Sequence, residues 1–100
     1  MTHTLFTYGT LQDPEVQKKV FGRTAKGLPD ALSDYAKSTI EINGNTYLLV
    51  IPAPGEKVQG LIIEVEDDEL EKIDDYETKA YRREEIALES GIFAWVYVKG

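Results

Sequence analysis

Most hydrophobic positions of the chain fall in short, β-rich runs that are separated by residues typical of turns. Asn43-Gly44-Asn45 lies between two such runs and predicts a hairpin, because asparagine and glycine adopt the turn conformations that join antiparallel strands. Gly60 lies inside another run, and a glycine within a strand often marks a bend or the close approach of another group. The runs that predict strands are residues 4–8, 38–42, 46–51, 58–65, 82–88 and 92–98.

Two other segments have the pattern of helices. Residues 13–15 read Asp-Pro-Glu and predict a helix start, because aspartate caps free amides, proline suits the first turn and glutamate favours the positive end of the helix dipole. Gly22 predicts the end of this helix. A second helix is predicted from Asp67 or Asp68 to Tyr76.

The remaining segments predict connections. Residues 27–30 contain Gly, Pro and Asp and predict a variable stretch, and residues 52–55, Pro-Ala-Pro-Gly, predict a loop. The chain shows no repeat and no linker, and its 100 residues are the size of one compact domain spanning residues 1–100. Hairpin-linked strands with two helices in so short a chain predict an α+β fold whose sheet curls towards a barrel.

Composition narrows the classes of function. Eleven basic and eighteen acidic residues give a net charge of -7, with no stripe of lysine and arginine, so neither nucleic acid nor an anionic membrane is an expected partner. The absence of cysteine excludes disulfides, a thiolate zinc site and a cysteine nucleophile. The amino terminus has no basic segment followed by a long apolar run, and no run approaches the ~20 residues of a membrane span, which predicts a cytoplasmic protein.

Acidic residues are concentrated between Glu64 and Glu77, where nine of fourteen positions are Asp or Glu. Such a run is usually the solvated face of a helix. Leu70 and Ile73, however, lie three residues apart and define a buried stripe, and a further step of four reaches Glu77. One carboxylate is therefore expected to face the interior.

Burial would raise the pKa of Glu77, and the neighbouring Asp74 and Asp75 would raise it further by disfavouring another negative charge. A carboxyl group of this kind can hold and return a proton near neutral pH. The alternative is an ordinary residue at the end of a helix that forms an ion pair with Lys79, Arg82 or Arg83.

Tyr8-Gly9-Thr10-Leu11 is a second candidate site, at the exit of the first strand. A turn that contains glycine can direct consecutive backbone amides outward, and such a concavity binds anions. The alternative is a tight turn with a purely structural role. His3 is the only histidine, so a Ser-His-Asp relay has no well-placed base, and phosphate-loop and dinucleotide fingerprints are absent. No cofactor or metal is expected.

Five segments of the chain form a combined pattern: residues 6–11 (FTYGTL), 20–23 (VFGR), 58–61 (VQGL), 70–77 (LEKIDDYE) and 81–83 (YRR). In this order they resemble the gamma-glutamylcyclotransferase-like family, which includes AIG2-like proteins and gamma-glutamylaminecyclotransferases. The chain departs from the family pattern at Thr78, where glycine is frequent, and at Leu48, where proline is common; many relatives also continue past the position of Gly100.

The resemblance implies a small mixed β-barrel flanked by helices and an enzyme that releases 5-oxoproline and an amine from a small gamma-glutamyl compound, without a cofactor. It implies that Glu77 is the catalytic acid and base and that Tyr8, Gly9, Thr10 and Leu11 hold the glutamyl group through backbone amides. Tyr81 or Tyr97 would line the pocket with a hydroxyl. Arg83 occupies the family's Tyr-x-Arg position, either as a substrate contact or as an ion pair at the junction between helix and strand.

Two other hypotheses remain open. The chain could be a binding module that holds a small carboxylated metabolite without turning it over. It could also be an interaction protein whose acidic helix docks on a basic partner.

Overall fold

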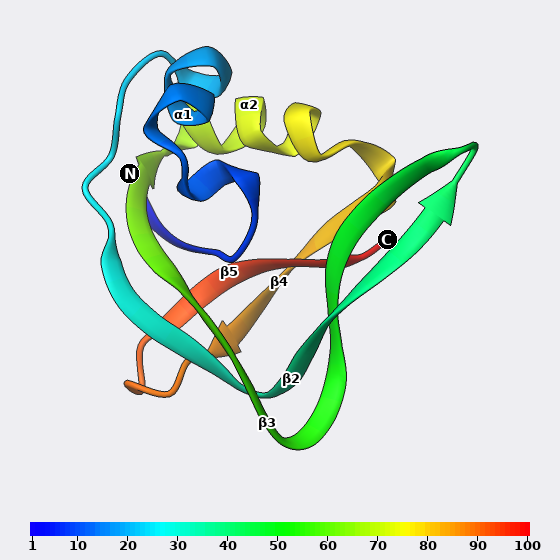
Figure 1. Ribbon diagram of the computed structural model, residues 1–100. Helices are drawn as coiled ribbons and strands as arrows, with labels where there is room; N and C mark the ends of the chain where they lie inside the picture. Colours follow the sequence, from blue (N-terminus) through cyan, green and yellow to red (C-terminus); the bar gives the residue numbers. More distant parts are fainter.

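The computed structural model describes residues 1–100 as one curled sheet with two helices on the same side (Figure 1). The five strands lie in the order β2-β3-β1-β5-β4, and only the β1–β5 pair is parallel. The sheet forms a half-barrel, which confirms the predicted α+β class. Its strands are β1 (Thr2–Thr7), β2 (Leu28–Ile42), β3 (Asn45–Glu66), β4 (Tyr81–Ala87) and β5 (Phe93–Lys99).

The hairpin between β2 and β3 turns at Asn43 and Gly44, as predicted. Both residues have positive φ angles, 52° and 83°, which suit the turn type that matches the twist of paired strands. The hairpin is longer than the sequence indicated, because β2 begins at Leu28. Residues 27–30 are therefore not a variable connection throughout, since Leu28, Pro29 and Asp30 already pair with β3.

The structure assigns residues 52–55 to β3, where the sequence predicted a loop, but of these residues only Pro52 has a partner in β2. Proline removes a backbone donor, but β1 pairs only with the part of β3 after residue 60, so one edge of β3 is unpaired at Pro52 and Pro54. The ladder between β2 and β3 also shifts register between Ser33 and Tyr35. The bulge there is held by the Asp34 carboxylate, which accepts a 3.0 Å hydrogen bond from the Gly55 N–H.

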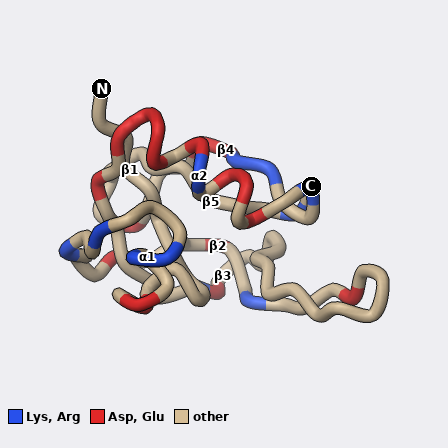
Figure 2. Tube along the Cα trace, turned by 90° about the horizontal axis from the view of Figure 1, so that it is seen from above, with Lys and Arg blue, Asp and Glu red and all other residues tan.

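Helix α1 (Pro14–Phe21) has the predicted ends. The Asp13 carboxylate accepts a 2.9 Å hydrogen bond from the Glu15 N–H, and Gly22, with φ 84°, closes the last turn on the Lys18 carbonyl. Helix α2 (Asp67–Glu77) begins at a capping box in which the side chains of Glu66 and Glu69 each bind the other's backbone N–H. Acidic residues follow the chain into and along α2 (Figure 2).

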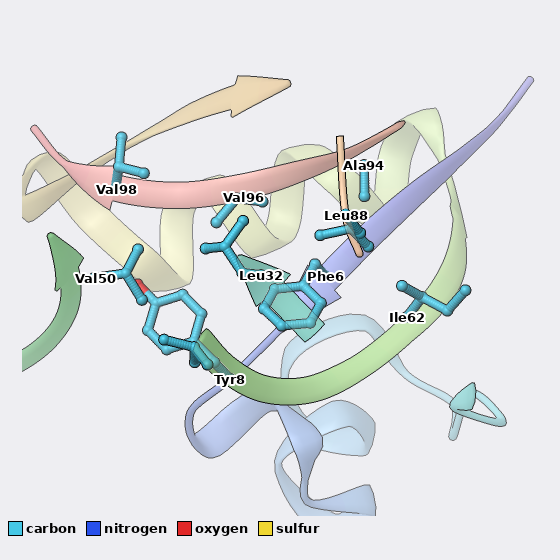
Figure 3. Close-up of a cluster of buried hydrophobic side chains, with 10 residues drawn as sticks. Phe6, Tyr8, Leu32, Val50, Ile62, Leu88, Ala94, Val96 and Val98 are labelled. Carbon is cyan, nitrogen blue, oxygen red and sulfur yellow. The ribbon is translucent and has the colours of Figure 1, made fainter. Parts of the chain in front are cut away.

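The core consists of two clusters of buried side chains. In the first, Phe6, Leu32 and Val96 meet inside the curl of the sheet (Figure 3). Gly60 is required there, since a Cβ atom at this position would lie 2.3 Å from the Thr7 carbonyl oxygen and 2.7 Å from Phe6 Cζ. The close approach predicted for this glycine is confirmed.

The second cluster packs the helices on the sheet. Leu70 and Ile73 of α2 are 4% and 0% exposed and contribute the predicted buried stripe. Two single 3-10 turns, Thr10–Gln12 and Thr78–Ala80, flank the helical layer. Neither helix has the length and apolar character that crossing a bilayer demands.

Candidate active site

A cavity of about 310 Å³ opens between the loop that follows β1, the β2–β3 hairpin and the end of α2. Seven of the eight residues named as candidates from the sequence border it, from segments that are as much as 89 positions apart in the chain. These seven are Tyr8, Gly9, Thr10, Leu11, Glu77, Tyr81 and Tyr97. The structure therefore brings the carboxylate and the first turn into one hollow.

Glu77 is the last residue of α2 and lies one helical turn after Ile73, so the buried stripe of the helix carries its side chain towards the cavity. Burial in the first place, and the negative charge of Asp74 in the second, raise the pKa of the Glu77 carboxyl to about 7. Asp75 is exposed and is not a cause of this shift, contrary to the expectation from its position. Near neutral pH the Glu77 carboxyl is therefore populated in both protonation states.

The loop after β1 supplies backbone donors. The carbonyls of Gly9 and Thr10 accept hydrogen bonds from Gln12 and Asp13, at 3.2 and 3.0 Å, and these two bonds form the 3-10 turn. The backbone N–H groups of Tyr8 and Gly9 donate to no acceptor in the protein. Tyr8 and Gly9 both border the cavity, so their consecutive N–H groups are candidates to bind an anionic ligand.

Five tyrosines border the cavity, and three of them, Tyr8, Tyr81 and Tyr97, donate their hydroxyl hydrogen to an acceptor in the protein. Tyr8 donates to the Tyr97 carbonyl at 2.6 Å, Tyr81 donates to the Leu48 carbonyl, and Tyr97 donates to Asp74 Oδ1 at 2.6 Å. Burial raises the pKa of Tyr81 to about 12 and raises those of Tyr8 and Tyr97 as well. These three phenols are therefore uncharged at physiological pH.

Aromatic packing links these phenols to the hairpin. The Tyr81 ring meets the rings of Tyr47 and Tyr97 edge to face, with centroids 6.2 and 6.4 Å apart. Because Tyr47 belongs to β3 and Tyr81 to β4, the contact joins the β2–β3 hairpin to the edge strand β4 beside the cavity.

Arg83 is the one expected site residue that the structure does not bring to the cavity. Its guanidinium forms a forked ion pair with Asp74, with Nε 2.7 Å from Oδ1 and Nη2 3.0 Å from Oδ2. The same guanidinium lies 4.7 Å from the centre of the Trp95 ring. These contacts correspond to the ion pair at the junction between helix and strand, the second role that the sequence left open.

Several lining residues were not identified from the sequence. Thr46, Tyr47 and Leu48 come from the hairpin, and no sequence pattern relates their positions to the first turn. Tyr76 precedes Glu77 directly and its hydroxyl lies 2.7 Å from Thr10 Oγ1, which connects α2 to the first turn. The position of Tyr76 next to Glu77 in the sequence was the one signal that could have identified it as a site residue. Helical spacing, however, predicts that Tyr76 lies on the outer face of α2, and its side chain is 41% exposed.

The acidic run is only partly a solvated face. Glu69 is 8% exposed, and both of its carboxylate oxygens bind Arg23, at 2.6 and 2.8 Å. Asp74 is paired with Arg83, and Asp67 contacts His3. Two of the seven carboxylates of α2, those of Glu69 and Asp74, are therefore paired with arginines within the chain.

Comparison with known proteins gives a consistent match. The family model described as "Gamma-glutamyl cyclotransferase, AIG2-like" matches residues 5–100. AIG2-like protein D of Arabidopsis thaliana is 32% identical over 87 residues, which are 86% of this chain and 56% of that protein. AIG2-like protein C of the same plant is 31% identical over 87 residues, or 49% of its length.

Solved structures share the fold. The solution structure of an Arabidopsis thaliana protein superposes with a TM-score of 0.84 at 27% identity, covering 99% of this chain and 62% of that one. A structure described as gamma-glutamyl cyclotransferase gives a TM-score of 0.77 at 16% identity, covering 100% of this chain and 68% of that one, which shows a common fold. The chain spans about half the length of the curated relatives that it matches.

Proposed function

We propose that this chain, which belongs to the gamma-glutamyl cyclotransferase, AIG2-like family, releases 5-oxoproline and an amine from a small gamma-glutamyl compound. One observation carries the proposal above all others. The Glu77 carboxyl, with a pKa of about 7, shares a cavity of about 310 Å³ with the unpaired N–H groups of Tyr8 and Gly9. A cavity of this size is at the small end of ligand pockets, which span roughly 300–1,000 Å³.

The reaction needs little more than positioning and one proton carrier. The substrate's own alpha-amino nitrogen attacks its gamma-carbonyl carbon, a five-membered lactam forms, and the bond from that carbon to the leaving nitrogen breaks. Glu77 takes the proton from the attacking nitrogen and returns it to the leaving amine, so that the carboxylate is regenerated. A carboxyl with a pKa near the working pH is suited to both transfers.

The turn after β1 has the chemistry to hold the glutamyl part of the substrate. No lysine or arginine borders the cavity, so a substrate carboxylate depends on backbone donors such as those of Tyr8 and Gly9. In this proposal Thr10 and Leu11 continue that turn and shape the floor of the site, while Tyr81 supplies a neutral wall. The free amides would hold the substrate in the geometry that closes the ring.

The magnitudes are sufficient for catalysis. An intramolecular nucleophile held in reactive geometry lowers a barrier by several kcal/mol and by up to about 7–11 kcal/mol. Proton transfer by a positioned carboxyl adds roughly 100- to 10,000-fold. In this proposal neither a cofactor nor a covalent intermediate is required.

The test is release of 5-oxoproline from a panel of gamma-glutamyl amines and peptides, followed by chromatography of the products. We expect turnover by the wild-type chain and a loss of roughly 100-fold or more in Glu77→Gln. Glu71→Gln is the matched control, since it makes the same chemical change at an exposed position of α2 and is expected to retain wild-type activity.

Absence of 5-oxoproline across the whole panel would refute the enzymatic proposal. A wild-type chain that is stabilised against heat by gamma-glutamyl compounds but releases no product would identify the cavity as a binding site without turnover. Equal activity in wild type and Glu77→Gln would remove the carboxylate from the mechanism.

A further inference from the structure

Asp74 and Arg83 form a charged pair next to the candidate carboxylate, although neither borders the cavity. Asp74 lies three residues before Glu77 on α2, and side chains with this spacing are neighbours on a helix surface. Its carboxylate receives three hydrogen bonds, two from the Arg83 fork and one of 2.6 Å from the Tyr97 hydroxyl. The position of this negative charge is therefore fixed from two strands.

The pair is also held from outside. The Arg83 guanidinium stacks over Trp95, which is its diagonal neighbour on β5, since Arg83 itself pairs with Tyr97. Tyr97 is 6% exposed, and its hydroxyl points to Asp74 while its carbonyl accepts the hydroxyl of Tyr8. Tyr97 thus connects the charged pair with the wall of the cavity.

The titratable groups that face Glu77 can be enumerated. From the first turn, β3, β4 and β5 they are phenols, which remain neutral below about pH 10, and from its own helix they are Asp74 and the phenol of Tyr76. The basic side chains nearby border a second cavity that shares only Tyr81 and Tyr97 with the first; they are Lys79, Arg82 and Arg83. Asp74, three residues before Glu77 on α2, is therefore the charged side chain that acts directly on Glu77, and Arg83 acts on Glu77 through its ion pair with Asp74.

We propose that Asp74 and Arg83 are positioning residues that set the proton affinity of Glu77, Asp74 by its negative charge and Arg83 by partly neutralising that charge. The effect on catalysis rests on the proposed function, whereas the effect on the titration of Glu77 does not. The two residues act in opposite directions: loss of Asp74 makes the surroundings of Glu77 more positive, and loss of Arg83 makes them more negative.

The experiment is a titration of the Glu77 carboxyl by NMR in protein with ¹³C-labelled glutamate side chains. Glu77→Gln assigns the resonance by removing it. We expect the titration midpoint to fall by roughly half a pH unit to one unit in Asp74→Asn and to rise by a similar amount in Arg83→Met. Asp75→Asn is the matched control, because it removes a neighbouring but exposed carboxylate and is expected to leave the midpoint unchanged.

The opposite signs separate this role from a structural one. Loosening of the helix end would expose Glu77 and lower its midpoint in both variants, so shifts in the same direction, or no shift in either, would overturn the proposal. Arg83→Lys keeps the charge without the fork, and its midpoint is expected between those of wild type and Arg83→Met. If Asp74→Asn does not fold, the proposal is tested with Arg83→Met and Arg83→Lys alone. A Glu77 titration midpoint in Arg83→Met at or below that of the wild type would then refute the proposal.

The titration is also independent of turnover. If the chain releases no 5-oxoproline but the midpoints shift as expected, the proposed function fails and the positioning role stands. If the chain releases 5-oxoproline but the midpoints do not move, the proposed function stands and the positioning role fails.

Discussion

Glu77→Gln is expected to stabilise the folded chain above neutral pH while it abolishes activity. The folded-state pKa of Glu77 is about 7, above its ordinary value of 4.5, so the folded chain holds a proton that the unfolded chain has released. The stabilisation that this proton represents is complete below pH 4.5 and is lost as the pH rises through about 7. Glutamine remains neutral at every pH, so the variant loses no stability from this position as the pH rises.

The magnitude follows from the shift. At roughly 1.36 kcal/mol per pKa unit, a change from 4.5 to about 7 corresponds to about 3 kcal/mol. Because the Glu77 carboxyl borders a cavity that solvent enters, about 1–3 kcal/mol is the expected difference between the variant and the wild type at pH 8. At pH 4 the two proteins are expected to have similar free energies of unfolding.

Urea unfolding of both proteins at pH 4, 6 and 8 measures this difference directly. Other titrating groups cancel when the two proteins are compared at the same pH, and Glu71→Gln, at an exposed position, shows what the loss of an ordinary charge does. A difference between Glu77→Gln and wild type that is the same at all three pH values would refute the reasoning, because it would mean that Glu77 titrates normally in the folded state.

Three further substitutions test the surrounding structure. Thr78→Gly is expected to raise the free energy of unfolding by about 1 kcal/mol, because φ 63° and ψ -171° belong to a region used almost only by glycine; an unchanged urea midpoint would contradict this. Gly60→Ala is expected to cost roughly 2–3 kcal/mol, measured in the same way, since its Cβ would overlap the Thr7 carbonyl, and a neutral result would mean that the strands separate easily. Tyr81→Phe removes the hydrogen bond to the Leu48 carbonyl and is expected to lower the free energy of unfolding by about 1 kcal/mol. Amide hydrogen exchange in the hairpin should then be faster than in the wild type. Exchange at the wild-type rate would show that this bond does not hold the hairpin.

Local signals in the sequence predicted the elements that depend on neighbouring residues. The ends of α1 follow from Asp13 and Gly22, whose side chain and backbone act within one turn. The hairpin turn follows from Asn43 and Gly44 for the same reason. The continuous strand through Pro52 was not predictable, because proline is tolerated there only as a result of how far β1 extends along β3.

The candidate site was predictable to a similar extent. The spacing of Leu70 and Ile73 placed Glu77 on the inner face of α2, and the family resemblance added the first turn. The hairpin wall and the pairing of Asp74 with Arg83 depend on contacts between strands that are distant in the chain. Such contacts depend on how the sheet curls, and no local sequence pattern predicts that curvature.

The hydrogen bond from the Tyr8 hydroxyl to the Tyr97 carbonyl joins residues that are 89 positions apart. During synthesis on the ribosome, this contact can form only after β5 has left the exit tunnel, so a nascent chain that ends before Tyr97 has no complete cavity. Proteins dominated by such long-range contacts fold slowly, in roughly milliseconds to seconds. The complete cavity around Glu77 is therefore expected to form late in folding, once β5 has paired with β1.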